Sequence, residues 1–489
     1  MTTAVIFVYL ALVLGIGLVS HRLFRGTGED YFVASRTIGP FLLLMSLFGT
    51  NMTAFAILGA SGESYHIGIG VFGLMASSSA LVIPAVFFFV GTRLWALGKR
   101  HGFLTQVQYF RRRWGSDGLG LGLFIVLVAL VIPYLLIGVM GGGLTMEQMT
   151  GGQIPAWVGG LLVCGVVLAY VCFGGLRGTA WANAFQTLVF MILGGVAFVT
   201  IIGQLGGLEQ ALDRVAQSHP ELLVRGDKIN SLKWLTYTCI PLSVGMFPHI
   251  FMHWLTAQSA RTFRWPIVLY PLCIGLVWVP SVLLGLVGTI DFPGLEGPAA
   301  NGVLVKLIDL HAPGLLAGLL AAGVFAAIMS SLDSQVLSIG NMFTQDIVRH
   351  YGFQDRMSDR QQILSGRLFV AAILAFTFVL SLVADRSIFK LAVWSFSGFA
   401  ALFPIVLAAL FWKRSTQYGA WASLLSVAVL WSYFFVQGWK TPGYTVGGTG
   451  LLPVAAMLAV SALAMVVGSL LSRPPDHTVL NQFFDKTRP

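Results

Sequence analysis

Thirteen apolar segments of membrane-spanning length follow one another along this chain of 489 residues. A helix needs about 20 apolar residues to cross the hydrocarbon core of a bilayer, and most of the segments are near that length. They cover about residues 3–20, 40–62, 71–95, 119–141, 155–173, 179–204, 233–254, 267–290, 313–345, 365–384, 389–412, 418–437 and 450–472. The sequence therefore predicts an all-α polytopic membrane protein with about 13 transmembrane helices.

The composition is typical of the same class. Hydrophobic residues make up 56% of the chain and charged residues only 10%, with a mean hydropathy of +0.83, whereas about a quarter of the residues in soluble domains are charged. Membrane chains are not built from separate soluble cores, so we interpret residues 1–489 as a single integral membrane domain. The four cysteines lie in apolar runs without metal-ligand spacing and are interpreted as packing residues.

The net charge of +10 is distributed unevenly between the loops. If the N-terminus lies outside, most of the Lys and Arg residues fall on the inner side, and the positive-inside rule then predicts an N-out, C-in orientation with a cytoplasmic tail at 473–489. The basic loop before residue 119 is interpreted as a segment on the bilayer surface, and no nucleic-acid partner is expected. The segment 3–20 lacks a basic n-region and an A-x-A site, which predicts a retained helix.

The ninth apolar segment carries polar oxygens deep inside a hydrophobic run. On a helix, five residues fall at i, i+3, i+4, i+7 and i+11 and form one stripe: Ala327, Ser330, Ser331, Ser334 and Ser338. Asp333 lies at its edge, where a charge costs roughly 2.5–3.5 kcal/mol by insertion scales. Serine in membrane helices commonly bonds its own backbone and only packs. With the carboxylate beside them, however, the oxygens suit a small hard cation.

Two of the segments are interrupted near their middles. Gly49-Thr50-Asn51-Met52-Thr53 breaks the second one, and Pro248 interrupts the seventh. An unwound helix at that depth is tolerated only where it is buried in protein or lines a cavity, so each break predicts a site. Each broken segment leads a set of five helices. This placement indicates an inverted-repeat transporter, with repeats at 40–204 and 233–412, one extra helix before them and two after, at 418–472.

No catalytic set is evident. His249 and His253 are one turn apart and could form a zinc pair, but no Glu lies between them and a third ligand is missing. The chain has neither a G-x-S-x-G elbow nor a P-loop. We therefore expect no enzyme activity and no cofactor.

Several motifs together resemble the sodium:solute symporter family, which includes sodium/glucose, sodium/proline and sodium/pantothenate transporters. They are EDYFVASRTIG, GGLRGTAWANAFQ, FPHIFMHWLTAQSAR, PGLLAGLLAAGVFAAIMSSLDS, FTQDIVRHYG and LFWKRSTQYGAWAS, and they span about residues 29–424. The resemblance implies thirteen helices, an outer N-terminus and a five-plus-five inverted repeat of the leucine-transporter type. It also implies sodium as the coupling ion.

The resemblance implies ligands for one sodium ion between the broken second span and the ninth. By position these are the carbonyls of Gly49, Met52 and Ala327 and the hydroxyls of Ser330 and Ser331. Gly49 stands where Ala is common in the family, a change that a carbonyl ligand tolerates.

Some members of the family have a second cation position, and the matching residues here are Asn183, Asp333 and Ser334. The family's acid in the sixth span is replaced by Asn183, while an acid stands in the ninth. Our hypothesis is that Asp333 serves as a second ion ligand or a proton carrier. The alternative is that Asp333 only hydrogen-bonds Asn183 or Gln186 as a structural contact.

Substrates of the family lie beside the two broken spans. The expected lining residues here are Asn51, Thr53, Phe55, Phe247 and His249. Phe55 and Ala56 occupy positions where sugar-binding members carry Glu-Gln, and His253 stands where Arg is common, so no anion-binding role is assigned to it. A small organic acid, amino acid or vitamin-like solute is therefore favoured over a hexose.

These interpretations converge on a sodium-coupled secondary active symporter that imports a small organic solute by alternating access. Two alternatives are a proton-coupled permease on the same fold and a membrane sensor that binds solute without moving it. We expect a multi-pass protein of the cell membrane, specifically a bacterial inner membrane, with the solute, Na⁺ and lipid as partners. The sequence leaves the oligomeric state open.

Overall fold

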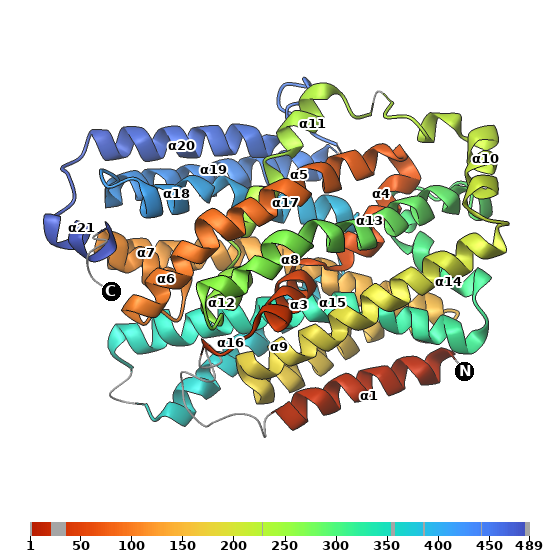
Figure 1. Ribbon diagram of the computed structural model, residues 1–489, viewed down its shortest axis with the longest axis horizontal. Helices are drawn as coiled ribbons and strands as arrows, with labels where there is room; N and C mark the ends of the chain where they lie inside the picture. The colour runs from red at the N-terminus through yellow and green to blue at the C-terminus, as the bar shows by residue number, and fades with distance from the viewer. Residues whose placement is uncertain are drawn as a thin grey trace.

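The computed structural model describes residues 2–20, 36–226, 228–353, 357–384, 387–441 and 443–484, and these are helical over most of their length (Figure 1). The first residues of the EDYFVASRTIG motif lie outside this description. In the described ranges, the extended pairings are two isolated bridges, Ile38 with Ala257 and Val446 with Leu451. The prediction of an all-helical protein is confirmed.

The helices, which are joined by short π and 3₁₀ turns, have the following bounds: α1 Thr2–Ser20, α3 Pro40–Asn51, α4 Ala60–Ile67, α5 Gly70–Val86, α6 Thr92–His101, α7 Gln106–Trp114, α8 Asp117–Met149, α9 Ala156–Gln204, α10 Leu208–Ser218, α11 Ser231–Tyr237, α12 Pro248–Leu255, α13 Arg264–Asp291, α14 Val303–His311, α15 Gly314–Met342, α16 Asp359–Ser381, α17 Ile388–Ala401, α18 Phe403–Phe411, α19 Gln417–Lys440, α20 Pro453–Leu470 and α21 His477–Phe484.

Among the described residues, nine helices are long and apolar enough to cross a bilayer, or up to eleven if each of two bent pairs is one span. Two more apolar helices, Thr2–Ile16 and Ala156–Cys172, are shorter. The protein is therefore a polytopic membrane protein. The predicted spans 155–173 and 179–204 both fall within α9, whose 49 residues would extend to roughly 74 Å if straight. The side chains of residues 173–177, where the two spans were expected to meet, lie outside the description.

Both predicted helix breaks are present. The segments Pro40–Asn51 and Phe55–Ile67 meet at 60°, and Ser231–Gly245 and Pro248–Leu255 meet at 48°. At the first break Met52 has an extended backbone. At the second, Phe247 is extended because a residue before proline disfavours the helical conformation. The two breaks thus expose backbone groups in the interior of the helix assembly.

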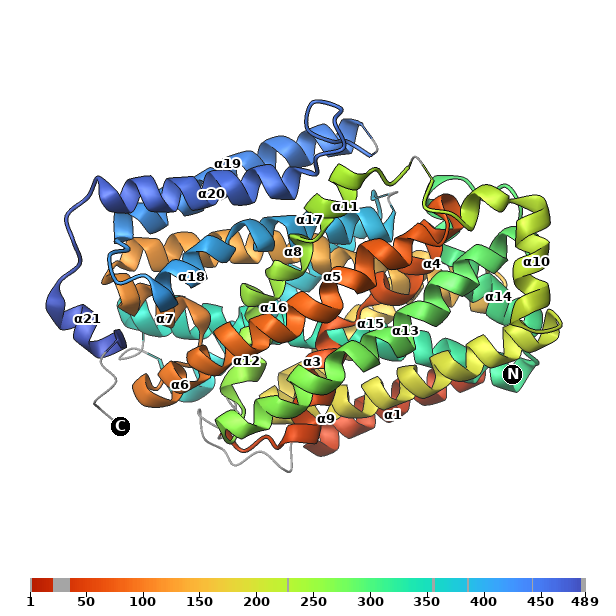
Figure 2. The ribbon, with the colours of Figure 1, turned by 45° about the horizontal axis from the view of Figure 1, so that its top comes forward.

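Helix α15 occupies the interior (Figure 2) and packs against α9, α8, α1 and α3. Nearly every residue from Leu320 to Met342 is buried. Glycine and alanine along its first half allow the close approach of neighbouring helices in lipid. The polar stripe of α15 is consequently enclosed by protein and faces other helices.

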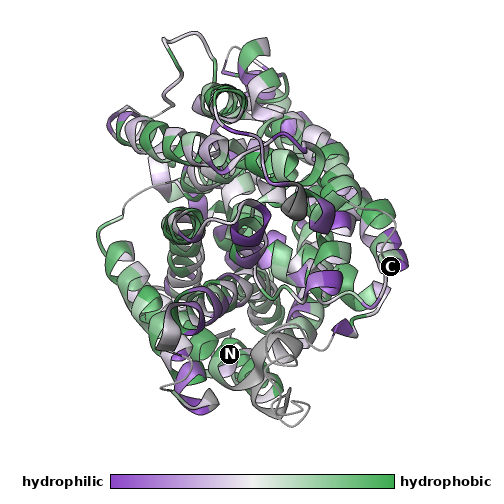
Figure 3. Cartoon of the chain, turned by 90° about the vertical axis from the view of Figure 1, so that its left-hand side faces the viewer, coloured by the Kyte–Doolittle hydropathy of each residue, from purple (hydrophilic) through white to green (hydrophobic). Residues whose placement is uncertain are grey.

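The outer surface is apolar. Large hydrophobic side chains such as Leu81, Val199 and Val383 are more than two-thirds exposed, and hydrophobic stretches lie on helices at the edge of the molecule in the end-on view, interspersed with hydrophilic ones (Figure 3). Exposed apolar surface on this scale is typical of a face that contacts lipid. The surface therefore agrees with a protein embedded in a bilayer.

The short helices α7 and α21 lie together at one end of the molecule in both ribbon views (Figures 1 and 2). Phe483 of α21 packs on Phe103 and Tyr109, and the His101 ring lies within 3.2 Å of the Gln482 carbonyl. The predicted tail, as far as it is described, is thus folded against the loop that contains α7.

Candidate functional site

The break after α3 lies directly against the polar stripe of α15. Ser330 Oγ donates a hydrogen bond to the Gly49 carbonyl at 3.0 Å and approaches the Ala327 carbonyl at 3.2 Å. The Ser331 hydroxyl donates to Ile328 O of its own helix at 3.0 Å. A hydroxyl can turn its hydrogen away and present a lone pair to a cation. Three of the five predicted sodium ligands are therefore in direct contact, and Ser331 adjoins them.

The close approach of α3 to α9 depends on glycine at position 49. A Cβ built there would clash with Thr187 Oγ1 and would stand 3.3 Å from the Asn183 carbonyl. Thr187 Oγ1 donates to Met45 O at 3.0 Å and is buried. Alanine at position 49 would require Thr187 to move. Glycine at this position therefore belongs to the packing of this chain, a point that the sequence alone did not reveal.

A second polar cluster surrounds Asp333 one turn further along α15. Tyr170 donates its hydroxyl hydrogen to Asp333 Oδ2 at 2.8 Å, and Asn183 Nδ2 donates to Ser334 Oγ at 2.7 Å. The His253 ring lies 3.1 Å from the same hydroxyl. Within the described residues, Asp333 Oδ1 and Asn183 Oδ1 have no hydrogen-bond partner although both are buried. The three residues predicted for a second cation position thus lie together, with two free acceptor oxygens.

Sequence reasoning missed Tyr170 in this cluster and assigned His253 no role. Both side chains lie in apolar segments, where a tyrosine or histidine at helical spacing is usually a packing residue. Their contacts join segments that are far apart in the chain, the fifth and seventh with the ninth. No spacing within one segment could have indicated these pairings.

A small cavity lies between the two helix breaks. Asn51, Phe55 and Phe247 line it, as expected of substrate-contacting residues. Thr53 does not line this cavity, and its hydroxyl accepts a hydrogen bond from the Phe55 backbone at 3.0 Å, within the break itself. His249 lies beside the lining, with its ring stacked on Phe247 at a centroid distance of 5.0 Å.

The cavity also has lining residues that the sequence did not indicate. Tyr237, Trp278 and Phe396 come from three different segments and complete its walls. Phe55 and Phe396 meet edge to face with ring centroids 5.3 Å apart. Their contribution arises from tertiary packing, which no motif in the sequence encodes.

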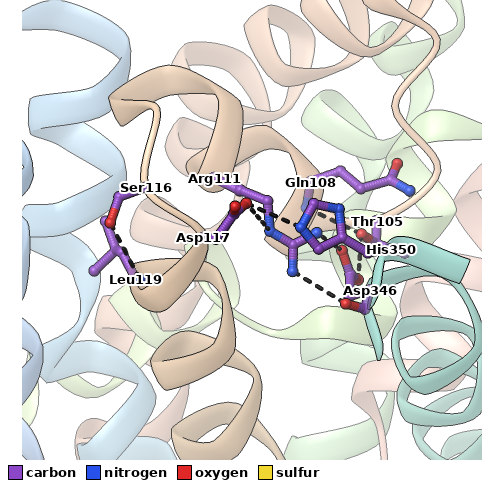
Figure 4. Close-up of polar contacts among 8 residues, drawn as sticks. All are labelled: Thr105, Gln108, Arg111, Ser116, Asp117, Leu119, Asp346 and His350. Carbon is purple, nitrogen blue, oxygen red and sulfur yellow. Dashed lines mark hydrogen bonds and ion pairs between the residues drawn. The ribbon is translucent and has the colours of Figure 1, made fainter. Parts of the chain in front are cut away.

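A buried ion-pair network lies further along the helical stretch that continues α15 (Figure 4). Asp346 Oδ1 is 3.3 Å from Arg111 Nη1, and its Oδ2 accepts a hydrogen bond from Thr105 at 2.7 Å. Arg111 also donates to the Asp346 carbonyl at 3.1 Å. Asp117 lies 3.7 Å from Arg111 Nε and 2.9 Å from the His350 ring. This network joins α7 to the helical stretch that continues α15.

Arg113 attaches α7 to another region, the end of α18. Its guanidinium donates to Ala409 O at 3.0 Å and to Trp412 O at 3.2 Å, both at the end of α18. Gln106 Nε2 donates to Met246 O at 3.0 Å, beside the second helix break. Helix α7 therefore joins three separate elements through buried side chains.

Comparison with known proteins identifies the family. The model of the sodium:solute symporter family matches residues 31–426. The chain belongs to this family. It is therefore a Na⁺-coupled solute symporter and not an enzyme, and the resemblance seen in its motifs is confirmed.

Relatives of this symporter are bacterial membrane transporters. The chain is 26% identical to the high-affinity proline transporter of Bacillus subtilis, over 96% of its own length and 98% of the relative's. It is 27% identical to the sodium/proline symporter of Haemophilus influenzae, over 97% and 95% of the two lengths. The alignments cover nearly the whole of each chain.

Solved structures share the fold of the symporter. A Na⁺-coupled sialic acid symporter in a substrate-bound, outward-open state with a novel Na⁺ site matches with a TM-score of 0.78 and 17% identity, over 97% of this chain and 99% of the other. The nucleobase-cation-symport transporter Mhp1 matches with a TM-score of 0.60 and 14% identity, over 93% and 98%. At these identities the likeness concerns the fold.

Proposed function

We propose that this symporter imports a small organic solute by alternating access, with one sodium ion bound between the break after α3 and the polar stripe of α15. The hydrogen bond between Ser330 and Gly49 supports this position most directly, because it brings a hydroxyl and an unwound backbone carbonyl to one point. Both are hard oxygen donors of the type that alkali and alkaline-earth cations prefer. The remaining proposed ligands are Met52, Ala327 and Ser331.

We further propose that Asp333, Asn183 and Ser334 form a second cation position. The two unpartnered oxygens in this cluster support it, since a buried acceptor without a partner is costly unless a ligand supplies the missing contact. A cation bound there would change the number of cations transported with each solute. The same carboxylate could carry a proton in place of a metal ion.

The proposed solute site is the cavity between the breaks, which Asn51, Phe55 and Phe247 line. Solutes of the relatives named above include proline, and the proposed class is an amino acid, an organic acid or a vitamin-like molecule. Thr53 and His249 are proposed as its supporting residues, because each contacts a lining residue.

The proposed topology has thirteen spans with the N-terminus outside, two five-helix inverted repeats at 40–204 and 233–412, and a single domain over 1–489. The two bent helix pairs, each at the head of one repeat, support this arrangement. The basic inner loops support an orientation in a bacterial inner membrane with residues 473–489 in the cytoplasm.

Tracer uptake into proteoliposomes tests the proposal. A sodium gradient is expected to drive uptake of at least one solute from a panel of amino acids, organic acids and vitamins, and Ser331→Ala is expected to reduce sodium affinity. An inside-negative potential should increase the rate, because each charge gains about 2.3 kcal/mol per 100 mV. Sodium-driven uptake that Ser331→Ala leaves unchanged would contradict the proposed ion site.

A further inference from the structure

The cavity between the two helix breaks has no ionised lining. Among the described residues that line it, none is Asp, Glu, Lys, Arg or His. A solute with net charge would lose its hydration there without gaining an opposite charge, which is strongly unfavourable in a buried site. The lining therefore disfavours dicarboxylates and organic cations.

Two polar groups in the lining lack partners. Tyr237 and Trp278 are each only 3% exposed, and neither the Tyr237 hydroxyl nor Trp278 Nε1 has a hydrogen-bond partner among the described residues. Indole Nε1 can only donate, and a phenol can donate as well as accept. The large majority of buried side-chain donors in proteins have a hydrogen-bond partner. An acceptor group on a bound solute would satisfy both.

A third polar group of the lining, the side-chain amide of Asn51, supplies a hydrogen-bond acceptor. Asn51 Nδ2 donates to the Tyr270 hydroxyl at 2.7 Å. This contact orients the amide, so that its carbonyl oxygen remains free to accept within the described part of the chain. The cavity thus presents an acceptor, two donors and the hydroxyls of Ser79 and Ser243, and all of these groups are uncharged.

Apart from the hydroxyls of Ser79 and Ser243, the rest of the wall is aromatic or apolar. Phe55 meets Trp278 edge to face at 6.4 Å between ring centroids, and Phe247 meets Phe396 at 5.5 Å. Such rings favour a flat or branched apolar body and offer few partners for a solute rich in hydroxyl groups. The cavity is small, which restricts that body to a small one.

We infer that Tyr237 and Trp278 determine specificity, by donating hydrogen bonds to the acceptor end of a small solute that has no net charge and an apolar body. A neutral amino or imino acid has this chemistry, with its carboxylate toward the two donors and its amino group toward Asn51. The inference rests on the proposed solute site, and it narrows the solute class by excluding organic acids, cations and sugars.

Uptake of single tracers distinguishes the inference from the proposed function. Purified symporter in proteoliposomes is given L-proline, L-valine, L-glutamate, L-lysine and D-glucose separately, under a sodium or a potassium gradient. We expect sodium-driven uptake of proline or valine to be at least tenfold faster than that of the other three. If sodium-driven uptake of glutamate, lysine or glucose is as fast as that of proline and valine, or faster, the inference is overturned while the symport function stands. Absence of sodium-driven uptake for all five would overturn the inference, and the symport function would fall only if the wider panel of amino acids, organic acids and vitamins also gave none.

Conservative variants test the two donors. Tyr237→Phe removes only the hydroxyl donor, whereas Trp278→Phe removes the indole donor together with part of the ring system, and we expect each to raise the KM for the transported tracer about tenfold. Maximal rate and the sodium concentration for half-maximal uptake should stay within twofold, a split that general loss of structure would not give.

Trp254→Phe serves as the matched control. Trp254 is fully buried and its Nε1 is also unpartnered in the described chain, but it packs against Phe87 and does not line the cavity. We expect the KM of the Trp254→Phe variant for the transported tracer to equal that of the unmodified protein. Unchanged KM in both test variants, or an equal increase in the control, would refute the assignment.

Discussion

Asp333 and Asp346 lie 13 positions apart on one helical stretch, roughly 20 Å along its axis, and both are fully buried. Their surroundings differ. Asp346 has hydrogen bonds or an ion pair at both oxygens, from Thr105 and Arg111. Asp333 has one hydrogen bond, from Tyr170, and its Oδ1 has no partner among the described residues.

We propose that the difference separates a structural carboxylate from a binding one. A buried ion pair is costly to break because the remaining charge has no compensation. A buried carboxylate with a free oxygen is incomplete without a ligand, and in membrane proteins such groups are found on ion and proton pathways. We therefore interpret Asp346 as a structural contact between α7 and the helical stretch that continues α15. We interpret Asp333 as part of the transport path.

Asp346→Asn should have the largest effect on stability. The substitution removes the buried carboxylate nearest Arg111, a loss that typically costs about 3–5 kcal/mol of unfolding free energy, and the exposed Asp117 at 3.7 Å offsets only a small part of it. Thermal and denaturant unfolding in detergent would measure it, with Arg112→Ala as the control because Arg112 is exposed. A loss no larger than that of the control would show that the network is not structural.

Gly49→Ala should come next. The added methyl group would clash with Thr187, and overpacking of this kind costs about 1–3 kcal/mol. The double variant Gly49→Ala/Thr187→Ala should recover much of the loss, because it provides the missing space. We would compare unfolding temperatures of the single and double variants. No recovery would indicate that the conformation of Gly49, and not its contact with Thr187, is limiting.

Asp333→Asn should affect cation coupling while leaving stability nearly unchanged. The amide can still accept from Tyr170, and removal of a buried charge does not itself destabilise the protein. We expect the sodium or proton dependence of uptake to shift about tenfold, equivalent to about 1.4 kcal/mol. If unfolding is affected as strongly as in Asp346→Asn, the contrast between the two carboxylates fails.

Asp117→Asn should have the smallest effect. The Asp117 side chain is 69% exposed, although it lies near both Arg111 and His350. Exposed ion pairs contribute about 0–1 kcal/mol. The same unfolding measurement at low and high salt should show a small, salt-sensitive change. A loss of unfolding free energy comparable to that of Asp346→Asn would show that the exposed Asp117 also belongs to the structural network.

The sequence alone predicted the features that interrupt an apolar pattern. Gly49 to Thr53, Pro248 and the serines of the ninth segment are visible because polar residues, glycine and proline are costly within a membrane helix. The structure has both breaks, and it brings Ser330 into contact with Gly49.

Contacts between distant segments were not predictable in this way. Tyr237 and Trp278 resemble ordinary packing residues of their own helices, and only the folded chain places them around one cavity. The Arg111–Asp346 pair joins residues 235 positions apart, and a basic loop gives no indication of which arginine is buried. Specific pairing depends on tertiary packing, which periodicity in one helix does not encode.

Sodium binding to Ser330→Ala, with Ser338→Ala as the matched control, tests the proposed ion site most directly. Both serines lie on the stripe of α15 and both donate to a backbone carbonyl, but only Ser330 contacts the break at Gly49. We expect Ser330→Ala to weaken sodium affinity at least tenfold, while Ser338→Ala leaves it unchanged. Equal affinities in the two variants would contradict a sodium site at this break.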